Sequence, residues 1–566
     1  MATKTGIVRS FNIYRGYGFI QIEGQKSLLF FHKSGLVDQI EENDKVSFDE
    51  SANERGPLAV NVRRILNNPS EQQNKLPNNE SNRSKLANNV ASIKTLKSIA
   101  ENWKLEAKLE TQKNYFYHLQ EVNSILNKNK YYIIGRKGSG KSSISEYLLG
   151  QKSFDTFCEK LSFKNFPFNE LYRLDNQRYT PPNQYITLWK YLIYSTVAKL
   201  MVGNEKIDIS VRNKLGEIYK AESMRSLSRT INHWTSAEFG ATILGTGGTL
   251  KLSRDIRNQS ANWVERVSDL EDIILEHCDD SKYFIIFDEL DEDYRSIKSN
   301  EHEQYNYLLT SLFKAVQDIK GTFISTKVNV CPVIFLRDDI YALIKDADKN
   351  KWRDFKIEIE WSEEKIKKLL AYRISKDSDC DDNLCFHDAC NLIFAQGNIT
   401  TPTGIHLDTF DYITRSTHLR PRDYIRYIQV CAEETVKLNR GKISNETIKY
   451  VDRAFSNYLK DEIVDELTPL LPDIEEILQI ISNLRKWAFN AEEFKREYVK
   501  YLKSKTVTEE NIDYVLDVLY KFSVLGNQHK TRQNTLYFKY MQTNMNLNRN
   551  EQLVVHRGLF KALQIV

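Results

Sequence analysis

Through the middle of the chain, short apolar runs typical of strands are interspersed with segments whose apolar residues have helical spacing. Three short runs, rich in aromatic and β-branched residues, predict strands buried on both faces of a parallel sheet. The runs are Tyr131–Ile134, Tyr283–Phe287 and Val330–Leu336. Helical spacing of apolar residues follows or separates them, at Ser143–Leu149, Asn306–Ile319 and Ser362–Ser375. Together these segments predict an α/β core.

The first 66 residues have a different pattern. Short apolar or alternating runs are separated by Gly, Asn, Asp and Pro, which predicts five strands and a small β-barrel. The runs are Thr5–Ile13, Gly18–Glu23, Leu28–His32, Lys45–Asp49 and Ala59–Ile65. Residues 67–89 are dominated by Asn, Ser, Gln, Lys, Glu and Pro, a composition typical of a linker, and helical patterning begins near Ala91.

Residues 461–566 read as three helices followed by a hairpin. The helices are predicted at Asp473–Trp487, Ala491–Ser504 and Glu509–Phe522, and the alternating segment is Thr535–Tyr540. This order suggests a winged-helix-like domain. Its basic residues favour DNA binding, but such folds also serve packing or oligomerisation, so both functions stay open.

A glycine-rich G-x-x-x-x-G-K-S sequence, the signature of a P-loop NTPase, follows the first buried run at residues 135–142. We therefore expect a multidomain protein with a small N-terminal OB-like β-barrel, a central α/β P-loop NTPase with a helical lid, and a C-terminal winged-helix-like helical domain. The expected boundaries are 1–66 for the barrel, 67–108 for a linker and leading helix, 109–376 for the core with an insertion at about 155–280, 377–460 for the lid and 461–566 for the last domain.

Composition changes this picture little. The chain has 566 residues and a net charge of +4 from 80 basic and 76 acidic residues, so any nucleic-acid surface must be local. No run approaches the ~18 apolar residues of a membrane span, and we expect a cytoplasmic protein without membrane contact. Seven cysteines fit reduced thiols. Cys380, Cys385 and Cys390 surround His387, but their spacing favours buried thiols beside an acidic loop over a metal site.

The strongest chemical signal is the G-x-x-x-x-G-K-S sequence that follows the first buried run. Glycines let a backbone fold around a triphosphate, a helix N-terminus favours anionic oxygens, and lysine adds a point charge. We expect ATP to bind here, with Ser142 as a Mg²⁺ ligand and Lys141 contributing to catalysis. The expected nucleotide contacts are Gly135, Lys137, Gly138, Ser139, Gly140, Lys141, Ser142 and Ser143.

Acidic residues complete the expected site at the end of the second buried run. A carboxylate at the C-terminal end of a central strand can hold Mg²⁺, and a second can orient the attacking water. We assign Asp288 to the metal and Glu289 to the base, with Asp291 and Glu292 as alternatives for the base. In the long interval between the two motifs, Ile186–Tyr194 reads as a helix and Phe239–Leu252 suggests a hairpin.

Two further positions carry arginines. Arg337 directly follows the third buried run, where it can reach the γ-phosphate or the attacking water, in cis or in trans. Arg420 and Arg422 flank Pro421, which suits the start of a helix. Either arginine of this pair could face the nucleotide.

The barrel segment contains Arg15-Gly16-Tyr17-Gly18-Phe19-Ile20 and Leu29-Phe30-Phe31-His32, which resemble the two nucleic-acid-binding motifs of cold-shock domains. That resemblance implies base stacking on single-stranded RNA or DNA by Tyr17, Phe19, Phe30 and His32, with Arg9, Arg15 and Lys33 near phosphates. Ser10 stands where the family usually has tryptophan, and Lys33 where it often has another aromatic. Docking of a protein partner is the alternative.

The order of motifs over residues 110–460 resembles a bacterial P-loop ATPase family close to AAA+ and STAND NTPases. The resemblance implies a catalytic sensor or finger role for Arg337, a lid sensor arginine at Arg420 or Arg422, and an ATP-driven molecular switch. It also suggests defence against phage, a homo-oligomer and a partner effector protein. A nucleic-acid remodelling motor and a nucleotide-stabilised scaffold without turnover are the alternatives.

Overall fold

A computed structural model describes most of the chain and divides it into two compact units, residues 1–82 and 83–566. The described residues are 4–12, 17–22, 28–32, 35–38, 40, 44–53, 56–64, 92–110, 115–164, 166–175, 179–180, 183–219, 226–236, 263–291, 301–378, 384–531 and 535–565. Among these residues, no helix is both long and apolar enough to cross a membrane.

The N-terminal unit is a closed barrel whose described strands follow the order β1-β2-β3-β5-β4. Its strands are β1 (Lys4–Asn12), β2 (Tyr17–Ile22), β3 (Leu28–His32), β4 (Lys45–Asn53) and β5 (Gly56–Arg64). Alternate residues of each strand point into the barrel, where Val8, Ile20, Phe31 and Phe48 are fully buried. Because the side-chain period is two, Tyr17, Phe19 and Phe30 lie on the outside.

The second unit contains a parallel sheet, which among the described residues has the order β10-β6-β9-β8-β7. The strands are β6 (Tyr132–Gly135), β7 (Thr156–Ser162), β8 (Lys282–Asp288), β9 (Asn329–Arg337) and β10 (Lys356–Glu358). All four neighbouring pairs are parallel. β6 therefore lies beside β9, and β9 separates it from β8.

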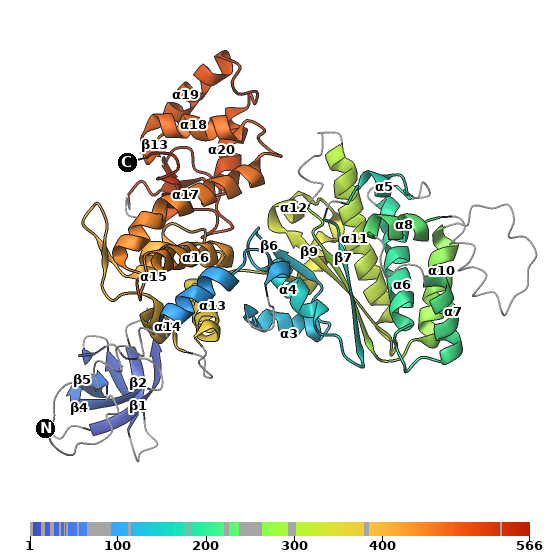
Figure 1. The fold of residues 1–566 in the computed structure, drawn as a ribbon, viewed down its shortest axis with the longest axis horizontal. Coiled ribbons are helices and arrows are strands. Elements are labelled where there is room, and N and C mark those ends of the chain that lie inside the picture. Colours follow the sequence, from blue (N-terminus) through green and yellow to red (C-terminus); the bar gives the residue numbers. More distant parts are fainter. Residues whose placement is uncertain are drawn as a thin grey trace, which may run out of the picture. The chain divides into compact units, whose positions relative to one another are not determined.

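Side chains of β8 explain why this sheet is buried on both faces. Tyr283, Ile285 and Phe287 pack into one cluster, whereas Phe284 and Ile286 pack into another. Helices α6 (Ile186–Met201), α10 (Trp263–His277) and α11 (Glu301–Phe323) cover the first face. Helices α3 (Gln120–Leu126) and α4 (Lys141–Leu149) cover the second, as Figure 1 shows. The continuous apolar runs in the sequence reflect this double covering.

The interval between the phosphate loop and the acidic strand belongs to this α/β fold. Residues 156–162 form β7, which pairs with β8 along its whole length, and α6 is a fully packed helix on the sheet. The helices α5 (Asn169–Tyr172), α7 (Ile209–Tyr219) and α8 (Leu227–Trp234) complete the described part of the interval. The hairpin predicted at Phe239–Leu252 lies outside the described residues. The expected insertion of about 155–280 thus begins with a strand of the sheet.

A helical layer follows the sheet in sequence. It comprises α13 (Glu363–Asp377), α14 (Phe386–Ile393), α15 (Thr409–Thr414), α16 (Pro421–Lys437) and α17 (Asn445–Leu467). The short helix α12 (Asp338–Leu343) lies between β9 and β10 in the sequence and packs into the core of the sheet. Ser362 caps α13 by accepting a hydrogen bond from Lys365 N, and Pro421 is the first residue of α16, as its position in the sequence predicts.

The C-terminal residues add three helices, α18 (Ile474–Leu484), α19 (Ala491–Lys503) and α20 (Ile512–Lys521). Four described strands form an antiparallel sheet in the order β13-β16-β14-β15: β13 (Ala488–Phe489), β14 (Leu525–Gln528), β15 (Leu536–Tyr537) and β16 (Gln552–Val555). One continuous hydrophobic cluster joins these elements to α13–α17, so the lid and the C-terminal region share a core.

Residues 92–110 and Tyr115 pack onto this same core ahead of the sheet. Trp103 Nε1 and the Tyr115 hydroxyl donate to the two oxygens of Asp377, at 2.6 Å each. Arg373 forms a buried ion pair with Glu110 and lies over the rings of Trp103 and Tyr115. This cluster fixes residues 92–110 and Tyr115 against α13. The short 3₁₀ turn Ala107–Leu109 within this segment lies beside α4.

Candidate functional site

The loop between β6 and α4 has the backbone that a phosphate-binding loop requires. Gly138 and Gly140 have φ angles of +78° and +95°, a left-handed conformation that favours glycine. Gly135 has no room for a side chain, since an added Cβ would lie 2.6 Å from Ser139 Oγ. The α4 N-terminus carries no side-chain cap at Gly140. The N–H groups in the first turn of α4 therefore receive no hydrogen bond acceptor from a capping side chain. They remain available for an anion.

Lys141, the first residue of α4, folds back onto this loop. Its Nζ donates to the carbonyl oxygens of Gly135 at 2.7 Å and Arg136 at 2.9 Å. Burial lowers the pKa of Lys141, while Asp291 and Asp338 act in the opposite direction. Within the described residues, the hydrogen-bond partners of the Lys141 ammonium group are these two backbone carbonyls, so an anionic ligand would improve its electrostatic environment.

Asp288 ends β8 and is held by a lysine that the sequence analysis did not single out. Lys160 Nζ, from β7, lies 2.7 Å from Asp288 Oδ2 and 2.8 Å from Glu146 Oε1 of α4. Burial lowers the pKa of Lys160, but the two carboxylates outweigh burial and raise it. β7 pairs Lys160 with Ile286 in register, and this pairing brings the lysine beneath the acidic strand end. No motif in the sequence marks Lys160, because its role depends on the strand order.

Glu289 follows Asp288 in a strained backbone conformation, with φ of +59°. Lys108 Nζ donates to both carboxylate oxygens at 3.0 Å, and the Ser162 hydroxyl at the end of β7 donates to Oε2. A non-glycine residue in the left-handed region costs on the order of 1 kcal/mol, and such residues cluster at functional sites. Lys108 and Ser162, from two segments distant in sequence, therefore fix the orientation of the Glu289 carboxylate.

Arg337 ends β9 and is buried among acids. Its guanidinium makes a bidentate contact with Asp339 at 3.0 and 2.6 Å and lies 3.6 Å from Asp291 Oδ2. Burial opposes the charge, but Asp339 and Asp291 raise the pKa of Arg337. Arg337 lies in the same cavity wall as Lys141. This location suits an action in cis, on a ligand held by its own chain.

The two arginines beside Pro421 have different surroundings. Arg420 is buried and held by Asp423, by Glu466 at 3.1 Å and by the Lys137 carbonyl at 3.3 Å. Arg422 lines the cavity, and an added Cβ on Gly138 would lie 3.2 Å from Arg422 Cβ. Arg420 therefore buttresses the phosphate loop, whereas Arg422 is the one placed to reach a ligand.

One cavity of about 580 Å³ joins these groups. Its walls include Lys137 to Ile144 of the loop and α4, the acids Asp288, Glu289 and Asp291, and the arginines Arg337 and Arg422. It opens at the ends of the neighbouring strands β6 and β9. The chain runs from β6 to β7 at one edge of the sheet, and from β9 to β10 at the opposite edge. Ligands of open α/β sheets bind at such a point, outside the carboxyl ends of the strands. The volume lies within the usual range of ligand pockets.

The donor set fits a nucleoside triphosphate with Mg²⁺. The open α4 N-terminus, the left-handed glycines and Lys141 suit phosphate oxygens, and the Ser142 hydroxyl with the Asp288 carboxylate suits a hard divalent cation. Aromatic and apolar side chains from residues before β6, among them Phe116 and Tyr117, line another wall and suit a base. Gly135 lies outside the lining but shapes the loop.

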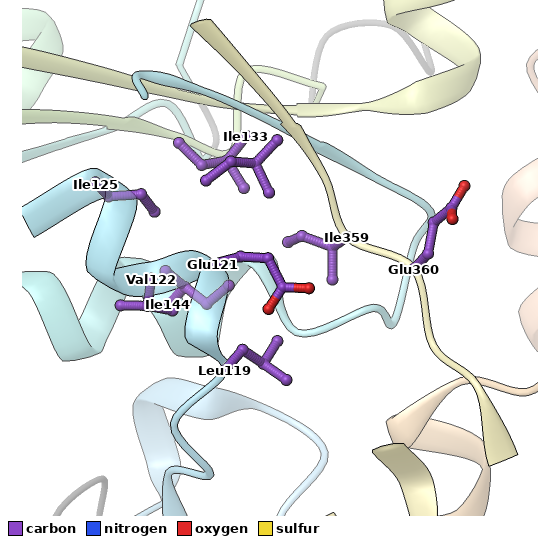
Figure 2. A pocket seen from close by; sticks show the side chains of 9 residues that line it. Leu119, Glu121, Val122, Ile125, Ile133, Ile144, Ile359 and Glu360 are labelled. Carbon is purple, nitrogen blue, oxygen red and sulfur yellow. The ribbon is translucent and has the colours of Figure 1, made fainter. Parts of the chain in front are cut away.

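A second, much smaller gap lies between α3, α4 and the sheet and has a volume of only about 10 Å³. Figure 2 shows it surrounded by apolar side chains from α3, α4 and the neighbouring strands, including Val122, Ile133 and Ile144, with the Glu360 carboxylate turned away from them. Space for about one water molecule cannot hold a ligand. This gap is part of the packing between α3 and the sheet.

The predicted stacking residues of the barrel lie together on its outside. The Tyr17 and Phe30 rings stack with centroids 5.9 Å apart, and Phe19 meets both rings edge to face. His32 is exposed and pairs with Tyr17 across the β2–β3 ladder. Arg9 Nε donates to Gln21 Oε1 at 2.6 Å. Arg15 and Lys33 lie outside the described residues.

The cysteine cluster gives no metal centre among the residues described. Cys385 Sγ accepts a hydrogen bond from Asp388 N at the start of α14, Cys390 is part of the same helix, and Cys380 lies outside the description. No group of three or more metal-binding side chains occurs in the described part of the chain.

The two units thus define a protein with a small β-barrel and a parallel α/β sheet that carries a phosphate loop. Residues 4–65 match the model of the 'Cold-shock' DNA-binding domain, and residues 393–464 match that of the FunZ-associated C-terminal helical domain. Cold shock protein 1 of Lactiplantibacillus plantarum is 43% identical over 63 residues, 10% of this chain and 94% of that protein. Cold shock-like protein CspB of Bacillus cereus is 39% identical over 64 residues, 11% of this chain and 97% of that protein.

Through residues 4–65, the chain belongs to the cold-shock domain family, as the sequence motifs suggested. Among solved structures, Cdc6p from Pyrobaculum aerophilum is 12% identical with a TM-score of 0.29, covering 83% of this chain and 96% of that one. The Drosophila ORC structure bound to DNA is 11% identical with a TM-score of 0.26, covering 88% and 97%. Scores this low do not establish a shared fold.

Proposed function

We propose that the chain is a Mg²⁺-dependent ATPase that acts as a molecular switch coupled to single-stranded nucleic acid. The observation that carries this proposal is the cavity at the C-terminal ends of β6 and β9. The phosphate loop, the Asp288–Glu289 pair and Arg337 all line this one cavity. Each of these features ends a different strand, so their convergence follows from the strand order.

Each side chain then has a defined task. Loop N–H groups and Lys141 Nζ bind phosphate oxygens, for which Lys141 exchanges its bonds to the carbonyls of Gly135 and Arg136. Ser142 and Asp288 hold Mg²⁺, which neutralises charge on the β- and γ-phosphates when bound. Lys137, Ser139 and Ser143 complete the loop contacts.

Glu289 accepts a proton from the attacking water, which requires that Lys108 release its carboxylate. Arg337 supplies positive charge at the γ-phosphate in cis. A lysine bonded to both oxygens of the base disfavours proton acceptance, so the structure corresponds to a resting state.

In this proposal, the barrel provides the surface that binds single-stranded nucleic acid. Tyr17, Phe19 and Phe30 present adjoining rings, and base stacking on such a platform is worth roughly 1–3 kcal/mol per base. His32, Arg9, Arg15 and Lys33 are assigned to the same surface. A protein of this kind could serve defence against phage, a role supported only by the resemblance in motif order.

The test compares ATP turnover by wild type, Lys141→Ala and Glu289→Gln, each with and without single-stranded RNA or DNA. We expect turnover in the wild type that the matching oligonucleotide stimulates. Lys141→Ala should lose both binding and turnover, whereas Glu289→Gln should bind ATP and turn it over at least about 100-fold more slowly. Strand separation by the wild type would favour a motor. Nucleotide binding without turnover under every condition would leave only a scaffold.

A further inference from the structure

One acidic side chain neutralises two cations of the nucleotide cavity at once. Glu462 Oε2, from α17, lies 3.3 Å from Lys137 Nζ and 3.3 Å from Arg422 Nη1. All three residues line the cavity, and their side chains are largely buried, with exposed fractions of 17%, 15% and 27% respectively. Lys137 comes from the phosphate loop and Arg422 from the start of α16, so the carboxylate joins the sheet to the lid.

Two other arginines near this cavity have acidic partners of their own. Arg337 is held by Asp339 and Asp291, and Arg420 by Asp423 and Glu466. Lys137 and Arg422 are therefore the cations that Glu462 keeps occupied within the cavity. Burial raises the pKa of Glu462, but Lys137, Arg422 and Arg420 lower it by more, so the residue is an anion near neutral pH.

A triphosphate entering this cavity brings several negative charges toward the same cations. Two anions cannot share Lys137 and Arg422 in a partly buried site without strong repulsion, because interactions there are weakly screened. Glu462 must then give up its contacts or the nucleotide must bind without them.

We propose that Glu462 is a built-in competitor for the phosphate groups, which nucleotide displaces from Lys137 and Arg422, and that α17 carries this displacement to the C-terminal region. The proposal rests on the function proposed above and deepens it by naming the residue that sets nucleotide affinity. Glu462 holds the cations in the nucleotide-free protein, and the phosphates take its place.

The position of Glu462 on α17 explains how its release reaches distant elements. Leu459 lies one helical turn earlier and packs against the C-terminal 3₁₀ turn Arg557–Leu559, where an added Cβ on Gly558 would lie 2.5 Å from Leu459 Cδ2. Ser456 Oγ, earlier on α17, accepts a hydrogen bond from Ala562 N at 2.9 Å. A shift of α17 must therefore change its contacts with the C-terminal residues.

The test measures affinity of the full-length protein for a fluorescent, non-hydrolysable ATP analogue with Mg²⁺. Glu462→Gln keeps the shape but removes the charge, and we expect it to bind the analogue about tenfold more tightly than wild type. Asp465→Asn is the matched control, because Asp465 lines the same cavity from the same helix but, among the described residues, forms no ion pair with Lys137 or Arg422. It should change affinity by less than about twofold.

A double-mutant cycle with Lys137→Gln separates competition from a general charge effect. If Glu462 competes for Lys137, the gain from Glu462→Gln shrinks in the Lys137→Gln background. Weaker binding by Glu462→Gln, or equal gains for Glu462→Gln and Asp465→Asn, overturns the proposal. Failure of the wild type to bind any nucleoside triphosphate overturns the proposed function instead.

Hydrogen exchange gives an independent readout. In the wild type, the analogue should change amide exchange in residues 455–467 and 556–563. In Glu462→Gln, these amides should already exchange, without nucleotide, as they do in the nucleotide-bound wild type. Unchanged exchange in the wild type at saturating nucleotide contradicts the proposed coupling through α17.

Discussion

At the scale of single residues, the buried Lys160 stands out because it bridges two carboxylates, Asp288 and Glu146. Lys160→Met removes the cation and leaves both acids uncompensated, which should lower the free energy of unfolding by about 3 kcal/mol. Lys199→Met is the control, since the Lys199–Glu159 pair is far more exposed and should contribute less than about 1 kcal/mol. Urea unfolding of both variants measures these free energies. Equal losses of unfolding free energy in Lys160→Met and Lys199→Met would contradict the assigned role of Lys160.

Two buried histidines give a pH dependence with a defined sign. His418 and His556 lie with ring centroids 4.4 Å apart, and burial followed by neighbouring charges lowers both pKa values, that of His556 to about 3. The unfolded chain, with an ordinary histidine pKa of about 6.5, then binds more protons at acidic pH. Stability from these residues is therefore complete above about pH 6.5 and is lost as pH falls toward 3.

At pH 5.5 the lowered pKa of His556 should cost about 1 kcal/mol of stability relative to pH 7.5. In thermal unfolding of the full chain, His556→Gln should reduce the loss of stability between pH 7.5 and pH 5.5 by the contribution of His556. His406→Gln, at an exposed position, is the control for the loss of an imidazole. An unaltered pH difference in His556→Gln would show that His556 titrates normally in the folded protein.

At the scale of elements, the turn Arg557–Leu559 fixes the C-terminal residues to α17 and the residues before α16. An added Cβ on Gly558 would lie 2.5 Å from Leu459 Cδ2 and even closer to the Ser416 carbonyl oxygen. Gly558→Ala should therefore destabilise the protein by about 2 kcal/mol or more. Gly321→Ala, on α11 with open space around the added Cβ, should instead stabilise it by up to about 1 kcal/mol. Calorimetric melting of the two variants checks this opposition.

The elements differ in how well the sequence predicts them. Buried strands such as Tyr283–Phe287 and the strand–loop–helix around Gly135–Ser142 are recognisable because local residue types decide both structure and chemistry. β7 was missed, since Thr156–Ser162 is an edge strand with two charged residues and no clear alternation. Lys160, Glu462 and Lys108 carry no motif, so only the strand order and helix packing reveal them.

At the scale of the whole molecule, the account predicts that two functions can be separated by mutation. Phe30→Ala removes the ring that contacts both Tyr17 and Phe19 and should weaken oligonucleotide binding about 5- to 150-fold. Basal ATP turnover should persist, while the oligonucleotide concentration needed for half-maximal stimulation should rise by the same 5- to 150-fold factor. Ile7→Ala, at an exposed position of β1, serves as the control in both assays. Full stimulation in Phe30→Ala would show that the ring platform does not sense nucleic acid.

We propose that one triphosphate with Mg²⁺ binds between the phosphate loop and the end of β8. An equilibrium titration of the full chain with a fluorescent ATP analogue, with and without Mg²⁺, tests this directly for wild type, Lys141→Ala and Asp288→Asn. We expect saturable binding by the wild type that Mg²⁺ strengthens, a loss of binding in Lys141→Ala, and a loss of the Mg²⁺ effect in Asp288→Asn. Equal affinities in all three proteins, or no binding by the wild type, would contradict it.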